Sequence, residues 1–254
     1  LQALAGSGVT PRPLACDPDP GPLGGGVLLM EYLPGRALRY DQDLVRAACI
    51  FARVHTTPVP DGLVVQPDPV KDIARECRGL LERYPDHPLR KECDEIRAYY
   101  DSVLELAEQT RPLFQGETLC LVNTEVNSGN FRISDRGAFL VDWEKAVISC
   151  RYQDLGHFLV PTTTLWKSET VLSPEDKARF LGTYRKEAGL DLDMESLTEK
   201  TRVLEKTILL RALSWCFMAF YEYTQTQRPL QNPDTLAKIK QYLADIPWIL
   251  GSVT

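Results

Sequence analysis

Along most of the chain, apolar residues recur every three or four positions, which is the spacing of one face of an α-helix. This pattern predicts helices over about residues 41–55, 70–84 and 88–107, and a long helix through about residues 204–222. Ser173 and Asn232, each followed by proline, are typical helix N-caps and predict two further helix starts. The chain is therefore expected to be mainly helical after its first 35 residues or so.

Short apolar runs predict strands in two places. The first lies before residue 35, where glycines 24–26 precede an apolar run and indicate a hairpin turn. The second is a hairpin of residues 130–134 and 138–142, in which residues 135–137 form the loop and Gly137 supplies its left-handed position. This loop places Asn130 directly opposite Asp142, with Cβ atoms about 4.5–5.5 Å apart. Glu144, two residues further on, is expected on the same face as Asp142.

Glu125, Asn130, Asp142 and Glu144 bring three carboxylates and one carboxamide to this hairpin. Oxygen ligands of this kind bind hard cations such as Mg²⁺, and a carboxylate at Glu125 could accept the proton of an attacking hydroxyl. Two other interpretations stay open. Residues 127–129 could be a simple polar turn, or Glu125 could join Asp142 or Glu144 in the two-carboxylate site of a hydrolase, which would leave Asn130 without a role.

Four short motifs follow one another in order: residues 8–13 (GVTPRP), 27–35 (VLLMEYLPG), 123–130 (NTEVNSGN) with 141–144 (VDWE), and 152–156 (YQDLG). Their order and spacing resemble those of the aminoglycoside phosphotransferase and choline-kinase-like family. In that family the corresponding segments precede the hinge, form the hinge strand, build the catalytic loop with its metal-binding strand end, and provide a later Y-x-D-L-A motif. Two residues differ from the family motif: Asn123 occupies the position of the family's histidine, and Glu125 occupies that of its catalytic aspartate.

The resemblance implies an α+β, protein-kinase-like fold with a mainly helical C-terminal lobe, a catalytic β-hairpin and a remnant of a small β-rich N-terminal lobe. It divides the chain into residues 1–35, the remnant of the N-lobe with the hinge, and residues 36–254, the helical lobe. It further implies a small-molecule kinase that uses Mg²⁺ and transfers the terminal phosphate of ATP or GTP to a substrate hydroxyl.

The resemblance also implies roles for individual residues. Glu125 is the catalytic residue, the hinge backbone at Met30, Glu31, Tyr32 and Leu33 binds the nucleotide, Asn130, Asp142 and Glu144 hold the metal, and Asn123 and Asp154 support the catalytic loop. Glutamate in place of aspartate moves the carboxylate outward by about one methylene, and a misplacement of roughly 1 Å can cost about 100-fold in rate. A weak or inactive pseudokinase that binds a ligand or regulates a partner is therefore the alternative.

Kinases of this kind carry a glycine-rich strand pair, a strand lysine and a helix glutamate before the hinge. None of these can be placed in this sequence, which also does not begin with methionine. We expect the sequence to be a fragment or clipped form that lacks its upstream lobe, or else a short natural relative.

The composition of the chain indicates its compartment and the class of its ligand. The net charge is −6, which argues against nucleic-acid binding and is compatible with a cationic small-molecule substrate. Seven cysteines without a C-x-x-C pair indicate a reducing compartment. No apolar run reaches the length of a membrane span, which takes about 20 residues, and no signal peptide opens the sequence. A cytoplasmic protein without a membrane association is expected, and its oligomeric state stays open.

The roles of several histidine and aromatic residues are a further question of the sequence. His55, at the end of a predicted helix, is expected to be structural, and His87, between prolines, is expected on the surface. The long helix carries Trp215, Tyr221, Glu222 and Tyr223, which could line a substrate pocket or belong to the core. Trp166 leaves the same two alternatives.

Overall fold

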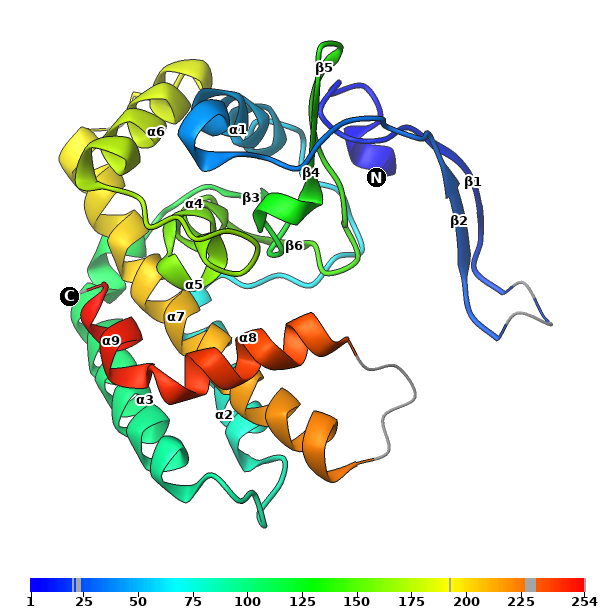
Figure 1. Cartoon of the computed structure of the whole chain (residues 1–254). Coiled ribbons are helices and arrows are strands. Elements are labelled where there is room, and N and C mark those ends of the chain that lie inside the picture. Colours follow the sequence, from blue (N-terminus) through cyan, green and yellow to red (C-terminus); the bar gives the residue numbers. More distant parts are fainter. Residues whose placement is uncertain (20, 22–23, 192, 227–231, 254) are drawn as a thin grey trace.

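The computed structural model describes residues 1–19, 21, 24–191, 193–226 and 232–253, and most of these residues are helical (Figure 1). The strands form three separate antiparallel pairs: β1 (Pro13–Asp17) with β2 (Val27–Met30), β3 (Leu119–Val122) with β6 (Val147–Cys150), and β4 (Phe131–Ser134) with β5 (Gly137–Leu140). The helices are α1 (Tyr40–His55), α2 (Pro69–Glu82), α3 (Arg90–Thr110), α4 (Tyr152–Leu159), α5 (Pro161–Thr164), α6 (Pro174–Glu187), α7 (Met194–Gln225), α8 (Pro233–Ala244) and α9 (Ile246–Gly251).

Local sequence signals set the ends of several helices. The hydroxyl of Ser173 accepts a hydrogen bond from the amide of Asp176 at the start of α6, and Asn232 accepts from the amides of Asp234 and Thr235 at the start of α8. Such caps satisfy amide groups that have no partner inside the helix. Both predicted helix starts are therefore confirmed.

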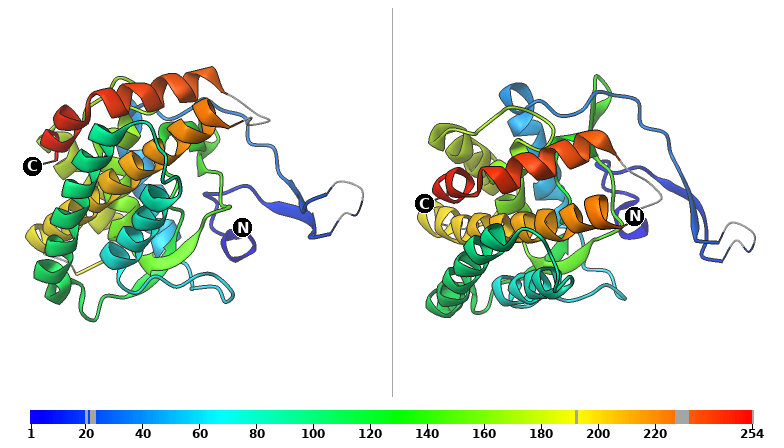
Figure 2. Two further views of the ribbon diagram at one scale, coloured as in Figure 1. Left: turned by 90° about the horizontal axis from the view of Figure 1, so that it is seen from below. Right: turned by 60° about the horizontal axis from the view of Figure 1, so that its bottom comes forward.

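Helix α7 is the central element of the core. It packs against α2, α3, α4 and α8, while α1 packs against α6, and Figure 2 shows α7 between α8 on one side and α2 and α3 on the other. Its buried residues lie on all sides of the helix, as expected of a helix surrounded by other elements. Within the described residues, no helix is both long and apolar enough to cross a membrane.

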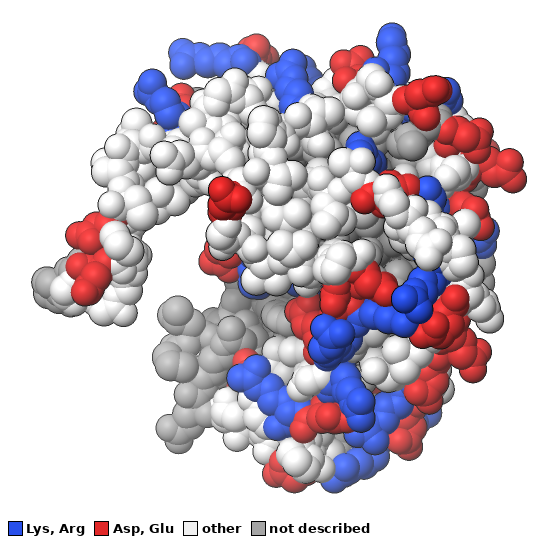
Figure 3. Space-filling model, turned by 180° about the vertical axis from the view of Figure 1, so that it is seen from behind, with Lys and Arg blue, Asp and Glu red and all other residues white. Residues whose placement is uncertain are grey.

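The β1–β2 hairpin forms an arm that extends away from the helical body (Figures 1 and 3). All four residues of β2 are exposed, and the arm surface is uncharged along most of its length. The chain before the arm behaves differently, because Leu4 and Val9 are buried in the main core. After the arm, Gly35 lies so close to β4 that a Cβ atom there would come 2.8 Å from the carbonyl oxygen of Ile133. Only glycine fits at this contact, since its φ is also +152°.

The β4–β5 hairpin has a different register from the predicted one. Ser134 pairs with Gly137 and Phe131 with Leu140, so the loop contains only two residues. A two-residue loop matches the twist of the flanking strands, and the change moves the pairing by one residue. The predicted opposition of Asn130 and Asp142 is therefore wrong: the carbonyl of Asn130 accepts a hydrogen bond from the amide of Val141.

The predicted surface position of His87 is also wrong. Its side chain is buried, its ring stacks on Phe217 with centroids 3.6 Å apart, and its Nε2 donates to the Phe217 carbonyl over 2.8 Å. The flanking prolines indicated a loop but carried no information about the helix that covers it.

Candidate functional site

The segment that follows β3 is held in place by a buried carboxylate on α4. Asp154, which is fully buried, accepts hydrogen bonds from the amides of Asn123 (2.7 Å) and Thr124 (2.8 Å). Asn123 in turn accepts from the amide of Glu125 through Oδ1 and donates through Nδ2 to the carbonyl of Asp142. These hydrogen bonds connect α4, the segment 123–125 and the chain after β5, so they fix where Glu125 and Asp142 lie.

Two residues of this region have unusual backbone conformations. Thr124 has φ +67° and Asp142 has φ +61°, and they are the described non-glycine residues with positive φ. This region is uncommon for a β-branched residue such as threonine, and the side-chain hydroxyl of Thr124 donates to the carbonyl of Lys145 over 2.9 Å. Backbone strain of this kind persists where surrounding contacts enforce it, often at functional sites.

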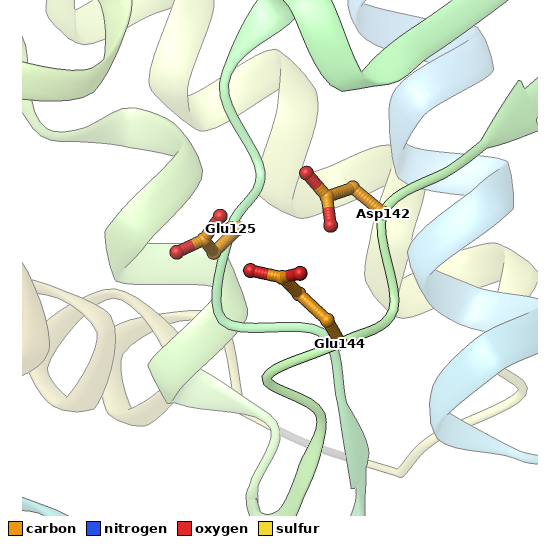
Figure 4. A group of neighbouring side chains, drawn as sticks. All are labelled: Glu125, Asp142 and Glu144. Atoms are coloured by element: carbon orange, nitrogen blue, oxygen red, sulfur yellow. The ribbon is translucent and has the colours of Figure 1, made fainter. Parts of the chain in front are cut away.

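Three carboxylates converge at this point. Each of Glu125, Asp142 and Glu144 has an oxygen within 4.8 Å of the other two, and Figure 4 shows the three side chains directed toward one space. The positive φ of Asp142, rather than strand alternation, directs its side chain, because β5 ends at Leu140. The pKa of Asp142 is raised, first by partial burial and then by the negative charges of Glu125 and Glu144. Clustered oxygen donors with an excess of negative charge fit a divalent cation such as Mg²⁺.

This charge cluster predicts a stability effect. A folded-state pKa above the ordinary value means that ionised Asp142 destabilises the folded chain at neutral pH, whereas below the ordinary pKa this cost is absent. We expect Asp142→Asn to raise the Tm of the metal-free protein at neutral pH, and added Mg²⁺ to raise the Tm of the wild type more than that of the variant. Thermal unfolding with and without Mg²⁺ measures both effects. A lower Tm for the metal-free variant would contradict the charge argument.

Asn130 lies at the end of a short 3₁₀ turn (Ser128–Asn130) before β4. Its Nδ2 donates to the carbonyl of Glu125 over 2.7 Å. Among the described residues, no group donates to its side-chain oxygen, so this oxygen is available as a neutral ligand. The metal role of Asn130 stays a prediction.

Lys145 is a charged neighbour that the sequence analysis missed. Its Nζ lies 2.5 Å from Oε1 of Glu125, and the two side chains are 50% and 28% exposed. The only sequence signal was a basic residue directly after the acidic motif, which does not specify a partner 20 positions earlier.

A pocket opens beside Glu125, with a volume of about 330 Å³. Aromatic walls come from Trp166, after α5, and from Trp215 on α7, whose rings are in edge-to-face contact at 5.8 Å. The pocket alternative therefore applies to these two tryptophans. Tyr221 and Glu222, further along α7, lie outside this pocket and contact the segment after α2. Tyr221 donates a hydrogen bond to Asp86, and Glu222 accepts one from the hydroxyl of Tyr84.

The segment predicted to bind the nucleotide lies at the base of the arm. Met30 and Tyr32 are 44% and 86% exposed. The amide of Glu31 already donates to the carbonyl of Arg12 over 2.9 Å. Among the described residues, no carbonyl accepts from the amides of Tyr32 or Leu33, so these two amides are the ones available to a ligand.

His55 has a structural environment, as expected. Both ring nitrogens have buried partners, the hydroxyl of Tyr184 at 3.0 Å and the carboxylate of Asp154 at 3.4 Å. Burial lowers the pKa of His55, so the ring is held as a neutral support for Asp154.

Comparisons with known proteins show the family and the fold of this chain. Residues 1–198 match the sequence model of the phosphotransferase enzyme family (APH), whereas no curated protein sequence matches the chain. Ethanolamine kinase from Plasmodium vivax has a similar structure, with a TM-score of 0.67 at 14% identity over 100% of this chain and 71% of that chain.

Two other solved structures have a similar fold. Choline kinase LicA from Streptococcus pneumoniae aligns with a TM-score of 0.65 at 16% identity, covering 100% of this chain and 77% of that chain. An aminoglycoside phosphotransferase, APH(2'')-IIa, solved in complex with gentamicin, aligns with a TM-score of 0.56 at 15% identity, covering 95% and 76%. These similarities confirm the predicted kinase-like α+β fold class.

Proposed function

Because the chain belongs to the phosphotransferase enzyme family, we propose that it transfers the terminal phosphate of ATP or GTP to a hydroxyl group of a small molecule. The observation that carries this proposal is the convergence of Glu125, Asp142 and Glu144 beside a pocket. A site for phosphate transfer needs negative ligands for a metal ion and a neighbouring space for the acceptor.

Each residue of the site has a role in this proposal. Glu125 accepts the proton of the acceptor hydroxyl or orients that hydroxyl. Asp142 and Glu144, together with the side-chain oxygen of Asn130, hold Mg²⁺, which when bound neutralises charge on the phosphate oxygens. Asn123 and Asp154 keep the loop in the conformation that presents Glu125.

The nucleotide base is proposed to bind along Met30, Glu31, Tyr32 and Leu33. The exposure of Met30 and Tyr32 at the base of the arm and the two available amides of Tyr32 and Leu33 support this placement. Because the amide of Glu31 is engaged with Arg12, this residue is left with its carbonyl as the group that can contact the base.

A pseudokinase is the second candidate, and one observation favours it. Glu125 stands where the family has aspartate, and its longer side chain is bound to Lys145. In a binding module this ion pair would simply neutralise Glu125, whereas in an enzyme it would hold the carboxylate where the acceptor hydroxyl arrives. Phosphotransfer measured by mass spectrometry over a panel of hydroxylated small molecules separates the two candidates.

The metal assignment predicts a specific loss of binding. Asp142→Ala should weaken the affinity for Mg²⁺–nucleotide by at least about 10-fold, since even the partners of metal ligands contribute about 10–100-fold. Isothermal calorimetry with Mg²⁺ and a non-hydrolysable nucleotide measures this loss. Asp135→Ala is the matched control, because it removes an equal charge from the exposed loop of the same hairpin. Unchanged affinity in Asp142→Ala would exclude the assignment.

Lys145 is proposed as a positioning residue for Glu125. Lys145→Met should lower kcat by roughly 10–100-fold, the scale of a misplaced reacting group, while the Kd for nucleotide changes little. Lys145→Arg should recover part of kcat, because arginine can also pair with Glu125. Lys91→Met, which breaks the exposed Lys91–Glu95 pair on α3, is the control. Equal loss of kcat in the methionine and arginine variants would contradict the positioning role.

We also propose a cytoplasmic location and a small-molecule partner rather than a nucleic acid or a membrane. The seven cysteines are all free thiols, as in a reducing compartment, and the net charge of −6 disfavours association with nucleic acid.

A further inference from the structure

The pocket beside Glu125 has walls of two kinds. Aromatic side chains of Trp166 and Trp215 form one side, and charged residues from α2, α7 and the catalytic loop lie around the rest. Its volume of about 330 Å³ is at the lower end of the range for small-molecule sites, about 300–1,000 Å³. This volume accommodates one ring with its substituents.

The charged residues of the pocket are balanced in pairs. Glu76 on α2 lies 3.4 Å from Nε of Arg211 on α7, and Glu125 lies 2.5 Å from Nζ of Lys145. His157, which also lines the pocket, adds no charge at neutral pH, because burial and the nearby Arg211 lower its pKa to about 3. The walls therefore carry two acidic and two basic side chains, each acid already bound to a base.

We infer that this pocket binds an uncharged hydroxylated ring, of the size of a monosaccharide or a cyclitol, as the phosphate acceptor. The inference rests on the proposed phosphotransfer. A cationic ring would lie against Arg211 and Lys145, and an anionic ring against Glu76 and Glu125, so either charge meets a like charge at close range. Uncharged hydroxyl groups avoid this repulsion, because they donate to carboxylates and accept from the guanidinium group in charge-assisted hydrogen bonds.

The aromatic walls are compatible with this ligand. An apolar ring face packs against tryptophan without cost to its polar edge. Tryptophan faces also attract cations, so the aromatic residues alone do not separate an uncharged ligand from a cationic one. The two basic side chains decide between them, because Glu76 and Glu125 are paired with Arg211 and Lys145. The remaining negative charge beside Glu125, on Asp142 and Glu144, belongs to the proposed Mg²⁺ site.

The pocket also relates the bound ring to the reacting group. Nη1 of Arg211 donates to the carbonyl of Thr124 over 3.3 Å, and Thr124 immediately precedes Glu125. A ring whose hydroxyl groups bind Glu76 and Arg211 is therefore held by the same side chain that contacts the catalytic loop. Since Glu125 lines the same pocket, we assign one further hydroxyl of the ring as the group whose proton Glu125 accepts.

Binding of matched rings tests the inference without any need for turnover. The probes are D-glucose and myo-inositol as uncharged rings, D-glucosamine at a pH where its amine is protonated, and D-glucuronate as the anion. Calorimetry or saturation-transfer NMR on the wild-type chain in the presence of Mg²⁺ should show an uncharged ring binding about 10-fold tighter than either charged ring. Equal affinity, a preference for a charged ring, or binding of none at millimolar concentration would overturn the inference.

Variants test the cause of this preference. Arg211→Gln should shift the relative affinity toward the amine-bearing ring by about 10-fold, and Glu76→Gln should shift it toward the carboxylate-bearing ring. Arg179→Gln, which removes an arginine from the exposed Arg179–Asp176 pair on α6, should leave the preference unchanged. If a variant does not fold, the comparison of matched rings on the wild-type chain still tests the inference.

The outcomes separate this inference from the proposed function. Phosphate transfer to an amine-bearing ring in preference to uncharged rings would leave the phosphotransferase proposal standing and remove only the inferred acceptor class. Tight binding of an uncharged ring without transfer to any hydroxyl would support the pocket assignment and count against the enzymatic function.

Discussion

Replacing Glu125 by glutamine should lower kcat by about 10²–10⁴-fold, the usual contribution of a positioned acid–base group. Glutamine keeps the size of the side chain but cannot accept a proton, and it also loses the ionic attraction to Lys145. The affinity for Mg²⁺–nucleotide should change by much less than in Asp142→Ala, because the proposed metal role belongs to Asp142, Glu144 and Asn130. Steady-state kinetics together with calorimetry distinguishes the two effects.

The control for this variant is Glu82→Gln, which makes the same chemical change in an exposed pair with Arg78 on α2. It should leave kcat within a factor of about two, since surface pairs contribute little. A Glu125→Gln enzyme with unchanged kcat would show that Glu125 is not the proton acceptor, and a wild-type protein without any transfer activity would favour the pseudokinase.

Replacing Asp154 by alanine should lower the free energy of unfolding by about 2–6 kcal/mol. The carboxylate is fully buried and accepts from the amides of Asn123 and Thr124. Its removal leaves two buried donors without an acceptor, and each such loss costs about 1–3 kcal/mol. The backbone of Thr124, with φ +67°, would also lose a contact that enforces its strained conformation, so activity should fall even where the chain still folds.

Urea denaturation measures this loss, with Asp41→Ala as the control. Asp41 lies on the surface in the first turn of α1 and pairs with Arg39, so its removal should cost no more than about 0.5 kcal/mol. Asp154→Asn should be intermediate, because one acceptor oxygen remains. A loss below about 1 kcal/mol in Asp154→Ala would mean that the loop amides find other partners, and the support role of Asp154 would be wrong.

Helices were predictable because their signals are local. The periodicity of apolar residues placed α1, α2 and α3 to within a few residues, and the caps at Ser173 and Asn232 marked the starts of α6 and α8. A cap or an amphipathic face acts on residues one to four positions away. The spacing of residues along the sequence is therefore sufficient to predict where these helices begin and end.

Pairing across the β4–β5 hairpin was less predictable. Two and three loop residues are both common in hairpins, and the choice between them moved the register by one residue and separated Asn130 from its expected partner Asp142. The motif order still predicted Glu125, Asp142 and Glu144 as one site, because it depends on residue types and spacing and not on the strand register. Their convergence to within 4.8 Å depends instead on the turn at Asp142, which the strand pattern did not indicate.

The sequence by itself determined the helical pattern, the motifs and the acidic residues of the candidate site. Only the tertiary structure decided which groups surround those acids. Lys145 lies 20 residues from Glu125, and Arg211 lies 87 residues from Thr124, in elements whose own patterns describe helix or loop and nothing more. The contact of Arg211 arises because α7 packs against α2 and α4, and that of Lys145 arises where the chain after β5 passes the segment after β3. Packing of whole elements sets those contacts, and no short stretch of sequence encodes which side chains will then meet.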